Sequence, residues 1–195
     1  MTRCYLGIDT SCYTTSVAIF NENGHLVAEA RKLLTVKAGG RGLAQSEMVF
    51  QHSRNLPLLL EQTLSSIADD RVLVAIGVSA YPRPLPDSYM PAFLVGEGYA
   101  RALACMQNSK LYRISHQENH ILAGIWSAGG PAGKDFLAVH VSGGTTEIVR
   151  VNKTSPMSLK RLGGSSDLHA GQFIDRVRVA MRLPFPAGKN KKKLA

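Results

Sequence analysis

Two histidines four residues apart could hold a metal ion. His116 and His120 follow Ser115, and Ser115 with Glu118 forms the Ser-x-x-Glu pattern of a capping box, which predicts that a helix begins at His116. Residues four apart lie on one face of a helix, where two imidazoles can bind a single metal ion. The sequence therefore predicts two metal ligands. The alternative is that two surface histidines happen to be neighbours.

The residues between the two histidines do not favour zinc-peptidase chemistry. In a His-Glu-x-x-His motif the glutamate directly follows the first histidine and acts as the general base. Here that position is Gln117, and Glu118 is rotated away from the histidine face. The pattern assigns no catalytic residue.

A turn rich in small residues follows twenty residues later. Ser142, Gly143, Gly144 and the Thr145-Thr146 pair follow a short apolar strand. Backbone N–H groups in such a turn can bind a phosphate, although a plain hairpin turn is an equal alternative.

Two further side chains near these motifs could contact a ligand. His140 ends the strand before the turn and could supply another metal ligand or a substrate contact, although a strand histidine commonly has no such role. Asp175 lies in a predicted helix, where an ion pair with Arg178 or Arg182 is the simpler interpretation. Neither a Walker loop nor a Gly-x-Gly-x-x-Gly loop is present.

The chain contains an internal repeat. Residues 6–20 and 137–151 align without gaps, with a leucine, a serine and a Thr-Thr pair at equivalent positions, and Asp9 corresponds to His140. Each copy reads as a strand, a tight turn and a strand. A unit repeated at long spacing predicts two similar subdomains.

The elements that must position these residues alternate between strands and helices. We expect strands near 5–10, 15–20, 25–32, 72–80, 111–114, 136–142 and 145–151, and helices near 45–68, 91–107, from 116, and 167–182. A Gly-rich loop is expected at 38–42, and the continuous apolar run 72–80 predicts a buried parallel strand. The pattern indicates an α/β protein.

The composition of the chain indicates which partners and which cellular compartment suit the protein. The 195 residues carry a formal net charge of +9, which suits a polyanion such as RNA and would equally suit a generic basic surface. Three scattered cysteines predict no disulfide framework and suggest a reducing cytoplasm. We expect neither a signal segment nor a membrane span.

Taken together, these segments resemble the TsaD family, the synthases of threonylcarbamoyladenosine in tRNA. The resemblance rests on five motifs in order: Leu6–Cys12, the His116/His120 pair, Val141–Thr146, Leu162–Asp175 and Leu183–Gly188. It implies a duplicated actin-like ATPase fold, with a first subdomain over residues 1–112 and a second, incomplete one over 113–195.

The resemblance also implies roles for individual residues. His116 and His120 would bind one divalent ion, zinc or iron. His140, Val141, Ser142, Gly143 and Gly144 would contact threonylcarbamoyl-adenylate, and Asp175 and Gly188 its ribose. The implied partners are tRNA and a TsaB-like paralogue or other subunits of a tRNA-modifying complex.

The chain departs from the family pattern in several places. Tyr13-Thr14 stands where the family has an acidic pair, Thr145 replaces a His or Asn, and Lys192 replaces a ribose-contacting glutamate found in some members. The family's aspartate metal ligand would lie beyond Ala195, so the resemblance implies an incomplete site.

Three functions therefore remain open. The first is a TsaD-like acyltransferase that modifies the tRNA adenosine next to the anticodon. The second is a non-catalytic nucleotide-binding paralogue that works as a partner subunit. The third is a carbamoyltransferase of the same fold with another acceptor.

Overall fold

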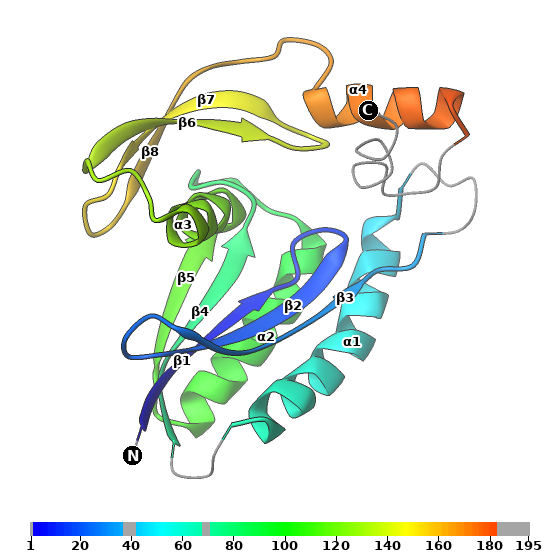
Figure 1. Ribbon diagram of the computed structural model, residues 1–195. Coiled ribbons are helices and arrows are strands. Elements are labelled where there is room, and N and C mark those ends of the chain that lie inside the picture. The colour runs from blue at the N-terminus through cyan, green and yellow to red at the C-terminus, as the bar shows by residue number, and fades with distance from the viewer. Residues whose placement is uncertain (1, 37–41, 68–70, 183–195) are drawn as a thin grey trace. The chain divides into compact units, whose positions relative to one another are not determined.

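The computed structural model describes residues 2–36, 42–67 and 71–182, which form two compact units, Met1–His120 and Ile121–Ala195 (Figure 1). This division follows spatial contacts. The boundary expected after residue 112 concerns the two repeated subdomains and stays a prediction. Most of the predicted Gly-rich loop, residues 38–41, lies outside the described residues.

The first unit is built on a mixed five-stranded sheet in the order β3-β2-β1-β4-β5. Its elements are β1 (Thr2–Asp9), β2 (Thr14–Asn21), β3 (Leu26–Leu33), α1 (Gln45–Ser65), β4 (Arg71–Tyr81), α2 (Pro91–Met106) and β5 (Lys110–Ser115). β1 pairs antiparallel with β2 and parallel with β4, which in turn pairs parallel with β5. The prediction of a buried parallel strand at 72–80 is therefore confirmed.

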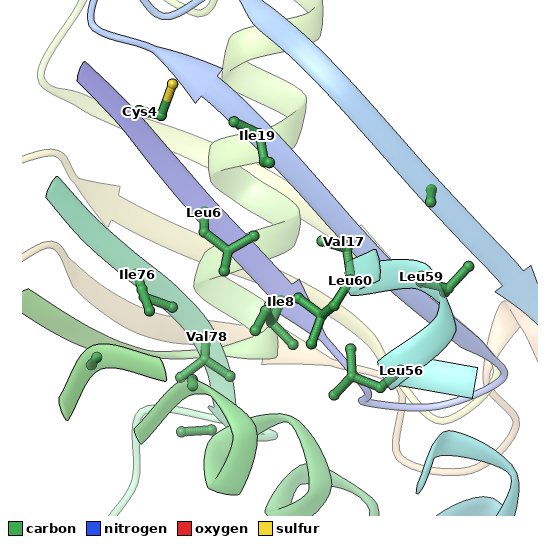
Figure 2. Close-up of a cluster of buried hydrophobic side chains, with 14 residues drawn as sticks. Cys4, Leu6, Ile8, Val17, Ile19, Leu56, Leu59, Leu60, Ile76 and Val78 are labelled. Carbon is green, nitrogen blue, oxygen red and sulfur yellow. The ribbon is translucent and has the colours of Figure 1, made fainter. Parts of the chain in front are cut away.

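Alternating side chains create the core of this unit. Leu6 and Ile8 of β1 and Val17 and Ile19 of β2 are buried, because residues two apart share a face of the sheet. Leucines of α1 and alanines of α2 pack on them, and Figure 2 shows this cluster, including Leu56 of α1. The helices α1 and α2 thus cover the face of the sheet that carries these residues.

The helix α3 (His116–Ala128) begins in the first unit and continues into the second. The second unit contains the antiparallel sheet β6-β7-β8 and the helix α4. The bounds of its elements are β6 (Asp135–Val141), β7 (Thr146–Asn152), β8 (Ser158–Gly164) and α4 (Ala170–Ala180). Its core joins Ile121 of α3 to Val149 and Val151 of β7.

The strand β8 was not predicted from the sequence. Its residues, Ser-Leu-Lys-Arg-Leu-Gly-Gly, lack a clear alternation of apolar and polar side chains, and a bulge shifts its register opposite Ile148 and Val149. It forms because it pairs with β7 along most of its length. Among the described residues, no helix is both long and apolar enough to cross a lipid bilayer.

Candidate metal and phosphate sites

A capping box places the histidine pair at the start of α3, as predicted. The backbone N–H of Ser115 donates to Glu118 Oε2 over 2.7 Å, and the backbone N–H of Glu118 donates to Ser115 Oγ over 3.1 Å. These reciprocal bonds satisfy N–H groups that a helix leaves without partners in its first turn. His116 is consequently the first helical residue.

The two imidazoles of the pair face each other. The Nε2 atoms of His116 and His120 are 2.8 Å apart, and the ring centroids are 4.2 Å apart. Two nitrogens bound to one tetrahedral zinc ion at about 2.05 Å would be roughly 3.3 Å apart. A small rotation of either ring would reach that spacing, so the pair fits two positions of a metal's coordination sphere. Among residues 2–36, 42–67 and 71–182, no group of three or more His, Cys, Asp or Glu side chains completes such a sphere.

The carboxylate of Asp9 lies behind the first histidine. Asp9 is the last residue of β1, and its Oδ2 accepts a hydrogen bond from His116 Nδ1 over 3.1 Å. The same oxygen accepts from Ser79 Oγ of β4 over 2.5 Å and from Asn119 Nδ2 of α3 over 2.8 Å. Oδ1 accepts from both the backbone N–H and the hydroxyl of Ser11. Asp9 therefore joins two strands to the start of α3.

The surroundings keep this carboxylate ionised. Burial alone would raise the pKa of Asp9, but the hydrogen bond and charge of His116, with the hydroxyls of Ser11 and Ser79, hold that pKa well below its ordinary range. An ionised Asp9 only accepts hydrogen bonds, so His116 Nδ1 carries the proton. In the neutral ring, Nε2 of His116 then accepts the 2.8 Å hydrogen bond from His120 Nε2.

The predicted phosphate turn joins β6 to β7 in the second unit. Ser142 N donates to Thr145 O over 2.7 Å, which closes the turn, and Gly144 N donates to Ser142 Oγ over 3.3 Å. The first turn of α4 is tied to the same place, because Ala170 N donates to Thr146 Oγ1 over 2.8 Å. This threonine supplies the cap that His169, the N-cap residue of α4, does not provide.

The glycines around this turn differ in how much space a side chain would have. A Cβ on Gly171 of α4 would lie 2.6 Å from the backbone nitrogen of Gly143, so only glycine allows this close approach. A Cβ on Gly143 or Gly144 would meet no atom within 4 Å, and neither residue has a left-handed φ. Within the described part of the chain, packing therefore does not require glycine at 143 and 144. Open space beside the turn suits close contact with a ligand.

The remaining predicted site residues have mixed placements. His140 and Val141 are on β6, with His140 opposite Glu147 of β7 and Val141 exposed beside the turn. Asp175 is in α4, where its Oδ1 is 3.7 Å from Arg178 Nε, the ion pair that the simpler interpretation predicted. Gly188 lies outside the described residues. His140 through Gly144 and Asp175 belong to the second unit, whereas His116 and His120 belong to the first.

Sequence reasoning missed the side chain that holds the turn between β1 and β2. His52 of α1 is fully buried, with Nδ1 2.8 Å from Thr15 Oγ1 and Nε2 3.0 Å from the carbonyl oxygen of Cys12. Nε2 therefore donates to Cys12 O, and Nδ1 accepts from the hydroxyl of Thr15. The only available signal was a histidine on the apolar face of a predicted helix.

Tyr13, one of the two residues that stand where the family pattern has an acidic pair, is held by packing. Tyr13 contacts an apolar cluster of Leu34, Met48 and Ala92, and its carbonyl accepts a hydrogen bond from Leu34 N over 2.7 Å. An aromatic side chain packed in this way cannot supply the charge of a carboxylate. At position 13 the first unit therefore has an apolar contact where the family pattern has an acid.

The family model and the curated relatives that match this chain agree on one family. The family model for tRNA N6-adenosine threonylcarbamoyltransferase (TsaD) matches residues 37–195. A protein of that name from Aromatoleum aromaticum is 34% identical over 185 residues, which cover 94% of this chain and 52% of that protein. A second, from Polaromonas sp., is 31% identical, with 97% and 54% covered. The chain spans about half the length of these curated relatives.

The fold has a match among solved structures. The ethanolamine utilization protein EutJ from Carboxydothermus hydrogenoformans superimposes with a TM-score of 0.54 at 16% identity, over 97% of this chain and 61% of that one. At this identity the likeness concerns the fold alone. The α/β fold is that of the actin-like ATPases, as expected, and the chain covers part of the matched structure.

Proposed function

Since the chain belongs to the TsaD family of tRNA N6-adenosine threonylcarbamoyltransferases, we propose that it forms part of an acyltransferase that modifies tRNA. The acceptor would be the adenosine next to the anticodon, and the donor threonylcarbamoyl-adenylate. The observation that carries this proposal is the convergence of the His116 and His120 Nε2 atoms, 2.8 Å apart, in a chain of this family.

The proposed reaction is an acyl transfer. The N6 amine of adenosine forms a bond to the carbamoyl carbon, the bond between that carbon and the phosphate oxygen breaks, and AMP leaves as N6 loses a proton. A surface that binds both the phosphate and the carbonyl would favour this reaction, because negative charge develops on both groups.

His116 and His120 would hold a zinc or iron ion through their Nε2 atoms. A bound divalent ion supplies a positive charge that polarises a carbonyl or phosphate oxygen. The chain's own contribution is to direct both Nε2 atoms toward one point, where they share a hydrogen bond that a metal ion would replace.

The turn in the second unit would bind the adenylate. Ser142, Gly143 and Gly144, with His140 and Val141 before them, would contact its phosphate or carbamoyl end. Open space beside the two glycines supports this assignment. Asp175 would bind the ribose only after its ion pair with Arg178 opens, and Gly188 is proposed for the ribose on the resemblance alone.

The partners and location belong to the same proposal. A net charge of +9 supports binding of tRNA, and a TsaB-like paralogue or other subunits would complete the complex. Three free cysteines, at positions 4, 12 and 105, support a reducing cytoplasm.

One observation favours a second candidate, a nucleotide-binding paralogue without catalytic activity. Tyr13 packs against apolar side chains where the family pattern has an acidic residue. If that acid is needed for the reaction, the chain would bind nucleotide and act as a partner subunit. A carbamoyltransferase with a different acceptor would explain the same change.

Metal analysis distinguishes the catalytic candidate from the non-catalytic one. We expect the purified protein to bind one equivalent of zinc or iron, and His116→Ala and His120→Ala each to reduce that content to a small fraction. His25→Ala is the matched control, because His25 is exposed in the turn before β3. Metal content that is far below stoichiometric and unchanged by either substitution would remove the metal-dependent transferase.

Filter binding against salt concentration tests the nucleic-acid partner. We expect the affinity for tRNA to fall steeply with salt, because each neutralised phosphate releases counterions. A response that is flat between low and moderate salt would exclude tRNA as a ligand of this chain. In that case the positive charge would be a general surface property.

A further inference from the structure

The proposed function assigns no role to Asp9, whose carboxylate accepts hydrogen bonds from four other residues. We propose that Asp9 is a positioning residue that fixes His116 as a metal ligand, by holding the Nδ1 proton so that Nε2 faces the metal position. The inference rests on the proposed metal site and adds the group that organises it.

The topology explains how Asp9 reaches the histidine. Asp9 ends β1, and the parallel neighbour of β1 in the sheet is β4, which supplies Ser79. β5 lies on the other side of β4 and leads directly into α3. The ends of parallel strands thus bring residues 9, 79 and 116 together from distant parts of the sequence.

The carboxylate cannot easily turn away from His116. Oδ1 accepts two hydrogen bonds from Ser11, at 2.8 and 2.5 Å, and Oδ2 accepts from Ser79 and Asn119 as well as from the histidine. Asn119 Nδ2 also donates to Ser79 Oγ over 3.1 Å, which closes the network. With donors on both oxygens, rotation of the carboxylate would break several bonds at once.

The geometry separates a positioning role from a ligand role. Asp9 contacts Nδ1, whereas the nitrogen facing His120 is Nε2. Phe93 of α2 contacts the ring of His116 with the centroids 6.1 Å apart, so the ring is restrained by packing as well. Loss of a hydrogen-bonding carboxylate behind a ligating histidine typically weakens metal binding by about 10- to 100-fold.

The test is Asp9→Asn, which keeps the size of the side chain and removes its charge. We expect the affinity for Zn²⁺, measured by competition with a chromophoric chelator, to fall about 10- to 100-fold. Asp135→Asn is the matched control, because Asp135 is an acceptor on β6 of the second unit with an exposed ion pair to Arg150. Thermal unfolding of each variant shows whether the fold is retained.

A second measurement needs no variant. In the metal-free wild-type protein, long-range ¹H–¹⁵N correlation spectra should show His116 as the tautomer protonated at Nδ1. The opposite tautomer, protonated at Nε2, would overturn the proposal even if Asp9→Asn fails to fold. Because a structural role for Asp9 would give the same tautomer, the Zn²⁺ affinity of Asp9→Asn is the measurement that separates the two roles.

The outcomes separate this inference from the metal site itself. If His116→Ala abolishes Zn²⁺ binding while a folded Asp9→Asn variant binds as tightly as wild type, the positioning role is wrong and the metal site stands. If wild-type protein binds no Zn²⁺, the metal site fails, and with it the positioning role. Weaker binding in Asp9→Asn together with a changed His116 tautomer supports both.

Discussion

At the scale of single residues, His52 shows how a buried polar side chain sets the shape of a turn. Its ring is hydrogen-bonded both to the carbonyl of Cys12 and to the hydroxyl of Thr15. Through these two bonds the helix α1 holds the two ends of the turn together. Asn55, one turn along α1, donates to the same hydroxyl over 3.5 Å. In the neutral ring Nδ1 accepts the hydrogen bond from Thr15, and protonation of Nδ1 would remove that acceptor.

His52 should make stability depend on pH. Burial lowers the pKa of His52 below 6.5, although the hydrogen bond to Cys12 and the charge of Asp9 oppose this effect. Below pH 6.5 the unfolded chain therefore binds more protons at this residue than the folded chain, so the free energy of unfolding falls as pH falls. We expect a loss of up to about 1 kcal/mol between pH 7 and 5.5.

Urea unfolding at the two pH values measures this contribution. His52→Gln should be less stable than wild type at pH 7 and should show a smaller loss of stability on acidification. His25→Gln, which replaces an exposed histidine, should keep the wild-type difference. Equal pH dependence in wild type and His52→Gln would show that the buried histidine is not the titrating group.

At the scale of elements, the local signals in the sequence were sufficient for most helices and strands. The Ser115/Glu118 capping box predicted the start of α3 to the residue, and the continuous apolar run predicted a parallel strand at β4. These features depend on neighbouring residues, so the sequence contains them directly. β8 was missed because its pairing with β7, rather than its own pattern, makes it a strand.

The same distinction applies to the candidate site. The spacing of His116 and His120 predicted that their rings would meet, because helical geometry fixes that relation. The contacts of Asp9 with Ser79 and His116 depend on the order of strands in the sheet, which no local pattern specifies. Long-range partners of this kind are visible only in the folded chain.

Contact between the phosphate turn and α4 gives a prediction about stability. An alanine normally favours a helix over glycine by about 1 kcal/mol. At Gly171 we expect the opposite sign, a loss of roughly 1 to 3 kcal/mol, because the added Cβ would collide with the backbone of Ser142 and Gly143. Chemical denaturation checks the sign, and an increase in stability would show that α4 does not pack on the turn.

Gly143, in the turn that Gly171 contacts, is the control for the substitution of Gly171 by alanine. A Cβ there meets no atom within 4 Å, so Gly143→Ala should leave the free energy of unfolding within about 0.5 kcal/mol of wild type. If the turn binds the adenylate, the same substitution should weaken binding of a non-hydrolysable adenylate analogue by at least tenfold in calorimetry. Unchanged binding with unchanged stability would remove Gly143 from the phosphate site.

At the scale of the whole molecule, the internal repeat allows the two sheets to be compared position by position. Leu6, Ile8 and Val17 of the first unit are at most 3% exposed, because α1 and α2 cover them. Their counterparts in the second unit are Leu137, Val139 and Ile148, which are 64%, 71% and 46% exposed. The opposite face of the second sheet packs on α3 through Val149 and Val151.

Leu137, Val139 and Ile148 form an apolar face that is exposed among the described residues, and this exposure can be tested in solution. We expect this chain to bind a hydrophobic dye, and Val139→Thr to reduce that binding while changing the free energy of unfolding by no more than about 0.5 kcal/mol. Val149→Thr, on the packed face of the neighbouring strand, should cost more than about 1 kcal/mol because it buries a hydroxyl in an apolar core. Similar costs for the two substitutions would show that the face carrying Val139 is covered in solution, and the dye would then remain unbound.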